Sequence, residues 1–247
     1  MSKFEHDRIV PDENSKLTKK EQVEGMFNNI AHRYDFLNRF LSAGIDIQWR
    51  RKAITELKAL NPKVVLDVAT GTADVAIMTY KALKPDNIVG IDISEKMLDV
   101  GQEKIKKEGL TRHIQLYKGD SETINFGDDT FDAITVAFGV RNFENLRKGL
   151  SEMRRVLKPG GKLVVLEFSK PVIPGMKQLY NLYMNVVAPN FGELFAKNKK
   201  AYKYLNESVQ AFPERKAFTE ILKETGFTDT YFKPLSLGIC CIYCGRK

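Results

Sequence analysis

Two polar side chains, Arg141 and Asn142, directly follow the apolar run "ITVAFGV" (134–140). Such a run is typical of a buried strand in a parallel sheet, and ligands of these sheets bind outside the carboxyl ends of the strands. Arginine keeps its charge and offers several N–H donors, and asparagine can orient a water or a ring oxygen. We therefore expect both residues to face a crevice. The alternatives are a salt bridge from Arg141 to N-terminal helices and a helix cap at Asn142.

A second group of candidate residues lies in "VVLDVATGTADVA" (64–76). A strand, a turn of small residues and a helix in this order let the backbone pass close to a ligand and point helix N–H groups at it. The segment lacks the G-x-G-x-x-G pattern of dinucleotide-binding proteins. We expect Asp67, Thr70 and Gly71 to bind a nucleotide-like cofactor of another class.

Acidic residues follow the next two expected strands. Asp92 ends "NIVGID", where a carboxylate can accept hydrogen bonds from the two hydroxyls of a ribose; a turn or cap residue is the alternative. Asp120 and Ser121, in "GDSE", can meet the amino group and ring edge of an adenine, or be ordinary loop residues. With Ala137 at the end of the fourth strand, these residues predict one cofactor site at one edge of a sheet.

The elements that must position these residues alternate between strand and helix. Near-continuously apolar strands are predicted at "KVVLDVA", "NIVGIDI", "IQLYKGD", "FDAITVAF" and "KLVVLEF", with "KPGG" as a turn before the last. This alternation indicates an α/β fold whose mostly parallel sheet is covered on both faces. "FTDTYFKP" and "GICCIYCGRK" predict a hairpin-like pair that closes the sheet.

We expect one domain over residues 1–247. Its parts are a helical lid (18–60), a cofactor-binding core (61–170), an aromatic-rich helical insertion (171–212) and the end of the sheet (213–247). The lid begins at a capping box of Thr18 and Glu21, and Ser94 fits the cap of a later helix. The first 17 residues are polar and predict a frayed segment.

Composition narrows the class of protein. Hydrophobic residues make up 43% of 247 residues, which is enough for a large core. No apolar run approaches the roughly 20 residues that span a bilayer, and the N-terminus lacks the apolar stretch of a signal peptide, so we expect a cytoplasmic protein. The three cysteines cluster in "CCIYC" with no histidine nearby, which predicts reduced structural thiols and no metal site. The net charge of +8 fits either solvated helix faces or contact with an anionic surface.

Together, the small-residue turn, Asp92 and "GDSE" resemble the class I S-adenosylmethionine-dependent methyltransferases. The resemblance implies S-adenosyl-L-methionine as cofactor and a Rossmann-like fold. Its sheet would have seven strands, mostly parallel with one antiparallel strand, and strands one and four would lie side by side. Arg141 and Asn142 would then lie beside the reactive methyl group.

Longer stretches give a closer match. The segments "YDFLNRFLSAGIDIQW" (34–49), "FGVRNF" (138–143), "RVLKPGG" (155–161) and "LEFSKP" (166–171) closely resemble the ubiquinone/menaquinone biosynthesis C-methyltransferases, over roughly residues 20–247. Leu37 stands where that family often has Met, and Asp46 where it often has His. The resemblance implies methyl transfer to a carbon of a prenylated hydroquinone. Demethylmenaquinol is the favoured substrate, and 2-methoxy-6-polyprenyl-1,4-benzoquinol, the ubiquinone precursor, is the alternative.

Methylation of a ring carbon needs an electron-rich ring, and a hydroquinone hydroxyl should resemble tyrosine, with a pKa of roughly 10. We expect Arg141 to stabilise the phenolate, Asn142 to orient a water or ring oxygen, and Asp35 or His32 to accept the proton. Tyr34 is expected in packing. Tyrosines of the insertion form either a core stripe or the wall of a tunnel for the quinone: Tyr180, Tyr183, Tyr202 and Tyr204.

Partners follow from the same reasoning. A prenylated quinol resides in the membrane, so we expect salt-sensitive, peripheral contact with the anionic inner face of the cytoplasmic membrane through basic side chains and the insertion. A homodimer stays open as an alternative to a monomer. A nucleic-acid methyltransferase is the remote alternative, but we expect no nucleic-acid partner, because the sequence shows neither an added binding domain nor an Asn/Asp-Pro-Pro-aromatic motif for a flipped base.

Overall fold

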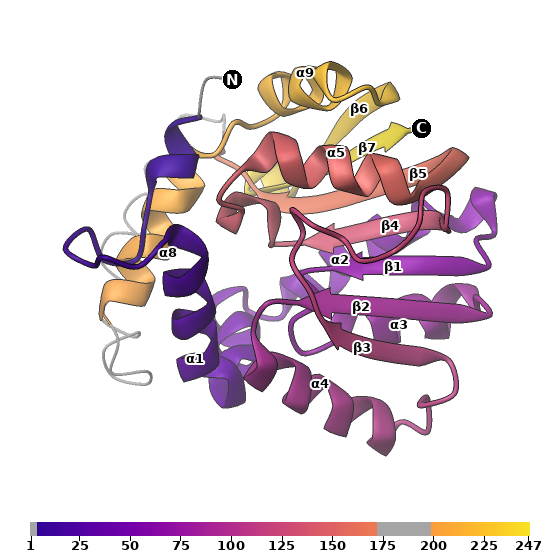
Figure 1. The fold of residues 1–247 in the computed structure, drawn as a ribbon, viewed down its shortest axis with the longest axis horizontal. Coiled ribbons are helices and arrows are strands. Elements are labelled where there is room, and N and C mark those ends of the chain that lie inside the picture. Colours follow the sequence, from indigo (N-terminus) through magenta and orange to yellow (C-terminus); the bar gives the residue numbers. More distant parts are fainter. Residues whose placement is uncertain (1–3, 172–198) are drawn as a thin grey trace.

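The computed structural model describes residues 4–171 and 199–247, whose strands form one seven-stranded sheet in the order β3-β2-β1-β4-β5-β7-β6 (Figure 1). Its strands are β1 (Val64–Val68), β2 (Asn87–Asp92), β3 (Ile114–Lys118), β4 (Phe131–Ala137), β5 (Leu157–Phe168), β6 (Thr228–Leu235) and β7 (Cys240–Arg246). β7 runs antiparallel to both of its neighbours, and the other pairs are parallel. The predicted α/β class and the single antiparallel strand are confirmed, as is the closing β6–β7 pair.

Helices connect these strands. The α-helices in the described residues are α1 (Lys19–Leu41), α2 (Ile45–Thr55), α3 (Asp74–Leu83), α4 (Glu95–Lys107), α5 (Leu146–Val156), α8 (Lys199–Ala211) and α9 (Lys216–Glu224). Short 3₁₀ turns are η1 (Glu5–Arg8), η2 (Lys58–Leu60), η3 (Val140–Asn142) and η5 (Ser236–Gly238). The capping box of Thr18 and Glu21 and the cap at Ser94 are confirmed. Asn142 caps no helix: Asn145 accepts the N–H of Lys148 and caps α5 instead.

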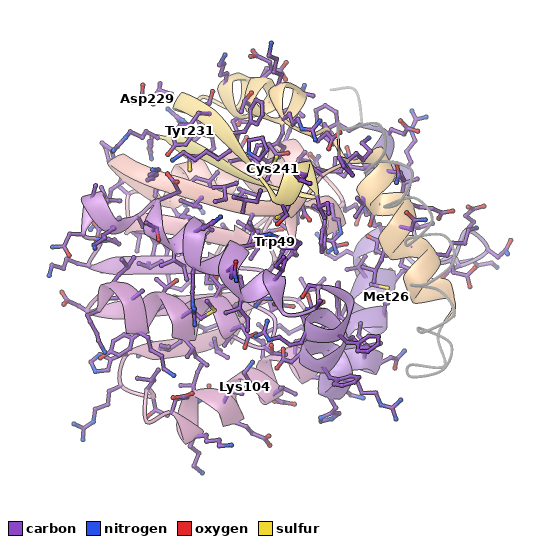
Figure 2. The ribbon with its side chains drawn as sticks, turned by 180° about the vertical axis from the view of Figure 1, so that it is seen from behind. Met26, Trp49, Lys104, Asp229, Tyr231 and Cys241 are labelled. Carbon is purple, nitrogen blue, oxygen red and sulfur yellow. The ribbon has the colours of Figure 1, made fainter. Side chains whose placement is uncertain are left out.

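Two apolar layers enclose the sheet. On one face, buried side chains of α5 and α9 pack on alternate strand residues; on the other face, α2, α3 and α4 do the same. Figure 1 shows α5 and α9 in front of the sheet and α2 and α3 behind it. Trp49 of α2 marks the centre of the rear layer in Figure 2, where its ring contacts Phe138 and Phe168. The predicted coverage of both faces is therefore confirmed.

Two local predictions were wrong. "KPGG" is not a turn before a strand but lies inside β5. The pairing register between β4 and β5 shifts at this place, between Phe131 and Ala133 of β4, and Gly160 has a φ of +77°. The N-terminal segment is not frayed from residue 4 on, because His6 is fully buried and its ring contacts Phe212. Lys19 donates a hydrogen bond to the His6 carbonyl (2.6 Å) and ties this segment to α1.

The helices α1 and α8 lie beside the edge of the sheet at which the parallel strands end (Figure 1). Met26 points from α1 toward α8 in Figure 2, and it packs with Val23 and the buried Tyr204. Most of the predicted insertion, residues 172–198, lies outside the described residues, including Tyr180 and Tyr183. Within the described residues, no helix has the length and apolar character of a membrane span.

Candidate active site

A pocket lies at the carboxyl ends of β1, β2, β3 and β4, under the N-terminal half of α1. β1 and β4 are neighbours in the sheet, and the chain leaves them toward opposite sides, so the pocket lies at a topological switch point. Its floor contains five predicted cofactor residues: Gly71, Asp92, Asp120, Ser121 and Ala137. The sequence therefore located residues from all four loops that border this pocket.

Asp67, near the end of β1, holds the loop that follows this strand. This carboxylate is buried and accepts hydrogen bonds from the hydroxyls of Thr70 and Thr135, both at 2.6 Å. Burial raises the pKa of Asp67 to about 6, although the two hydroxyl donors oppose the shift. Among the described residues, neither Asp67 nor Thr70 lines the pocket. The contacts of Asp67 and Thr70 support a role in holding the loop. Direct contact of either residue with a cofactor stays a prediction.

Asp92 faces the pocket from the end of β2. Its two carboxylate oxygens accept the backbone N–H groups of Gly71 (2.8 Å) and Ser94 (2.9 Å). Desolvation raises the pKa of Asp92 to about 6, against these donors. Each oxygen keeps a second lone pair, so the fixed carboxylate can still accept a hydrogen bond from a ligand hydroxyl.

The loop after β3 carries a residue that the sequence reasoning missed. Glu122 is buried and accepts the N–H groups of Glu144 (3.1 Å) and Asn145 (2.9 Å), which joins this loop to the start of α5. Lys20 of α1 pairs with Asp120 and lies 3.6 Å from Glu122. Both Lys20 and Glu122 line the pocket. Nothing in the local sequence signals these contacts, because they join segments 22 to 100 residues apart.

The loop after β4 approaches the loop after β1 closely. A Cβ at Gly139 would lie 2.6 Å from the Cβ of Ala69, so a side chain there would push the two loops apart. Ala137, Phe138 and Asn142 all line the pocket. The pocket wall between β1 and β4 therefore depends on this glycine.

Arg141 and Asn142 diverge. Asn142 lines the pocket, but the Arg141 side chain is buried, contrary to the expectation that it faces the crevice. Its Nη1 donates to the Phe138 carbonyl (2.6 Å) and to Oε1 of Glu167 on β5 (2.7 Å). The guanidinium also lies over the Phe168 ring. A salt bridge is thus present, although its partner is a strand residue and not an N-terminal helix.

The predicted lid residues are likewise separated by the structure. The Asp35 carboxylate accepts hydrogen bonds from Thr72 Oγ1 (2.6 Å) and Lys104 Nζ (2.9 Å), and it does not contribute to the pocket wall among the described residues. His32 is exposed. Tyr34 lines the pocket and meets Phe27 edge-on. Proton transfer to Asp35 or His32 stays a prediction.

Asp46, where the sequence departs from the common family residue, has a structural role. It is buried, pairs with Arg39, accepts a hydrogen bond from Ser42 Oγ (2.9 Å), and lies 3.5 Å from Arg50 Nε. These contacts join the end of α1 to α2. Asp46 thus positions the lid helix and is not among the described residues that line the pocket.

Cys240, Cys241 and Cys244 lie on β7 as free, buried thiols, and burial raises their pKa values. The described part of the chain contains no group of three metal-binding side chains.

The pocket fits S-adenosyl-L-methionine in two respects that the structure shows. A desolvated carboxylate at Asp92 is already fixed by backbone donors, which suits a diol, and the loops of Gly71 and Gly139 bring backbone close to the cavity. Asp120 and Ser121 close one end with polar atoms, and apolar side chains of α1 cover the top.

Comparisons with known proteins agree with this geometry. The sequence model of the ubiE/COQ5 methyltransferase family matches residues 15–247. A relative from Bacteroides fragilis named demethylmenaquinone methyltransferase is 48% identical over 244 residues, 99% of each chain. A relative from Geotalea daltonii named ubiquinone/menaquinone biosynthesis C-methyltransferase UbiE is 45% identical over 94% of this chain and 99% of its own.

Solved structures share the fold. The phosphoethanolamine N-methyltransferase 2 of Haemonchus contortus, solved with phosphomonomethylethanolamine and S-adenosylhomocysteine, has a TM-score of 0.57. The match is 16% identical and covers 80% of this chain and 52% of that one. At this identity the likeness shows the fold alone.

Proposed function

This chain belongs to the ubiE/COQ5 methyltransferase family, and on that premise we propose that it is a demethylmenaquinone methyltransferase that uses S-adenosyl-L-methionine. It would methylate a ring carbon of demethylmenaquinol in menaquinone biosynthesis. The observation that carries the proposal is that Asp92 and Asn142, one suited to a ribose and one to a substrate oxygen, line the same pocket at the β1–β4 switch point.

The cofactor would be held by residues of four loops. Asp92 would accept the ribose hydroxyls, Gly71 would bring its loop close to the ligand, and Asp120 and Ser121 would meet the adenine. Ala137 would form the wall nearest the reacting carbon. When bound, S-adenosyl-L-methionine supplies an electrophilic methyl group, which the ring carbon takes as the methyl–sulfur bond breaks and the ring loses one proton.

The chain's own residues would make the ring reactive. Asn142 offers N–H donors to a hydroquinone oxygen and so favours loss of its proton, which places charge on the ring. Arg141 would act through its buried charge and through its hold on η3, because its Nη1 is already engaged by Glu167 and the Phe138 carbonyl. Phe27, Tyr34 and Phe138 shield the cavity from water.

Access to a membrane-resident quinol would come from peripheral contact. Phe36 and Phe40 stack on α1 and are 55% and 45% exposed, and Ile45 at the start of α2 is 38% exposed. These apolar side chains and the net charge of +8 support contact with an anionic bilayer surface.

A homodimer also stays a prediction, which sedimentation at several concentrations would test.

The decisive experiment offers the purified chain labelled S-adenosyl-L-methionine and three acceptors. These are short-chain demethylmenaquinol, short-chain 2-methoxy-6-polyprenyl-1,4-benzoquinol and total RNA, with products identified by mass spectrometry. We expect methyl transfer to demethylmenaquinol and none to RNA. Transfer to the benzoquinol alone would assign the protein to the ubiquinone branch, and transfer to neither quinol would overturn the proposal.

A further inference from the structure

Tyr204 on α8 reaches the one polar residue of η3 that faces the pocket. Its hydroxyl donates a hydrogen bond to Oδ1 of Asn142 at 3.1 Å. The side chain is 1% exposed and packs against Val23 and Met26 of α1. The ring is thus fixed by two helices, and its hydroxyl is placed against a residue that comes 62 positions earlier in the chain.

The direction of this hydrogen bond determines which atom Asn142 offers to the pocket. Burial raises the pKa of the Tyr204 hydroxyl, so it keeps its proton at any working pH and acts as a donor. Its donation occupies the amide oxygen, Oδ1. Nδ2 makes only a long contact of 3.4 Å with the Phe138 carbonyl. An amide nitrogen has two protons, so Asn142 keeps an N–H donor for a ligand.

We propose that Tyr204 is a positioning residue for the methyl-transfer reaction: it locks the Asn142 amide with the nitrogen toward the substrate oxygen. The inference rests on the proposed function, since it assigns that oxygen to a hydroquinone. Without the lock, the amide can rotate by half a turn and present its carbonyl oxygen, which repels a developing phenolate. The helix that follows residues 172–198 therefore completes the site through one hydroxyl.

The buried pair behind η3 supports the same geometry from the other side. Glu167 accepts the backbone N–H of Arg141 at 3.4 Å as well as its Nη1, which fixes the turn that carries Asn142. Glu167 of the sheet thus holds the η3 turn, and Tyr204 of α8 holds the Asn142 amide. Tyr204 thus sets only the rotation of the amide, and its loss should leave the turn in place.

A double-mutant cycle tests the proposal with the full chain. Tyr204→Phe removes the hydroxyl alone, and we expect kcat with short-chain demethylmenaquinol to fall about tenfold, the effect of one hydrogen bond, with little change in KM. In an Asn142→Ala background the same change should cost less than about twofold, because the partner is gone. Tyr117→Phe is the matched control, since that exposed hydroxyl bonds only to Gln115 among the described residues.

A second readout does not depend on turnover. The side-chain amide signal of Asn142, identified by its absence in Asn142→Ala, should shift in ¹⁵N–¹H spectra of Tyr204→Phe and stay in place in Tyr117→Phe. The pH profile of kcat in Tyr204→Phe should also move to higher pH, because the substrate hydroxyl is less acidified. If Tyr204→Phe does not fold, 3-fluorotyrosine at position 204 serves instead; this stronger donor should move the Asn142 signal away from its wild-type position.

The outcomes separate the two proposals. A wild-type chain that binds S-adenosyl-L-methionine but methylates no quinol overturns the proposed function, and with it the role of Tyr204 in that reaction. An active wild type in which Tyr204→Phe is equally harmful with and without Asn142 overturns the positioning role alone. An unmoved Asn142 amide signal in the Tyr204 variants overturns it as well.

Discussion

The Arg141 guanidinium and the Glu167 carboxylate form an ion pair inside the protein, with 2.7 Å between Nη1 and Oε1 and side-chain exposures of 4% and 0%. The pair joins η3 to β5 directly beneath the pocket. Burial raises the pKa of Glu167, and the nearby positive charge of Arg141 opposes that shift. Removal of either charge alone would leave the other buried without a counter-ion, which destabilises the fold.

Glu167→Gln should therefore destabilise the protein by about 3–5 kcal/mol, because Arg141 would keep a buried charge without its counter-ion. Urea unfolding at neutral pH measures the change. Glu220→Gln is the control: that carboxylate pairs with Lys223 on the surface of α9, and its loss should cost less than about 1 kcal/mol. Equal effects of the two changes would contradict a structural role for the buried pair.

Arg141→Lys should reduce turnover by about tenfold, the scale of one hydrogen bond, because it loosens the buried contacts that hold η3 and Asn142, while cofactor affinity changes little. A lysine keeps the charge, but its ammonium ends the side chain earlier than Nη1 of arginine, the atom that bonds both Glu167 and the Phe138 carbonyl. Single-turnover methyl transfer and calorimetry with S-adenosyl-L-methionine would measure the two quantities. Full turnover in a folded Arg141→Lys protein would show that Arg141 has no part in the reaction.

Asp92→Ala should weaken S-adenosyl-L-methionine binding by tens of fold, because it removes an acceptor already fixed by Gly71 and Ser94. The pKa of Asp92 is about 6, so wild-type affinity should also decline as the pH falls through that value and the carboxylate gains a proton. Calorimetry between pH 5 and pH 8 checks both points. Asp99→Ala, on the exposed face of α4, should bind normally.

The stability of Asp67→Asn relative to wild type should be higher at pH 8 than at pH 5. The folded-state pKa of Asp67, about 6, exceeds its ordinary value of 3.8, so its contribution to stability is full below pH 4 and is lost as the pH rises through 6. The difference between the two pH values should be about 1 kcal/mol. Urea unfolding of both proteins measures it, and a difference independent of pH would contradict the shifted pKa.

Binding to vesicles that contain anionic lipid should weaken at high salt and in Phe36→Ser/Phe40→Ser. The exposed pair on α1 would otherwise enter the interface, and the basic surface would attract the headgroups. Flotation of the protein with phosphatidylglycerol vesicles tests this. Leu237→Ser, at an equally exposed apolar residue on η5, is the control. Flotation unchanged by salt and by the double change would exclude this surface.

The sequence predicted the sheet and much of the pocket because both depend on short-range patterns. Asp92 was correctly predicted to face the pocket, because a residue at the carboxyl end of a parallel strand lies at the edge of the sheet where ligands bind. The direction of Arg141 could not be predicted, because it depends on Glu167, a carboxylate within an otherwise apolar strand. Tyr204 was predicted as a core or tunnel residue, but its bond to Asn142, like the contact of Lys20 with Asp120, could not be predicted, because no local pattern encodes how α1 and α8 pack against the site.

The three cysteines of the chain all lie on β7, and each has a fully buried side chain. A thiol reagent can therefore modify the native protein only after this interior strand, which is paired with both β5 and β6, has come away from its neighbours. The rate of thiol labelling therefore measures how often β7 separates from its neighbours in the native protein, and no engineered cysteine is needed. Repeating the measurement with S-adenosyl-L-methionine would show whether a ligand in the pocket at β1 to β4 slows the separation of β7 from its neighbours.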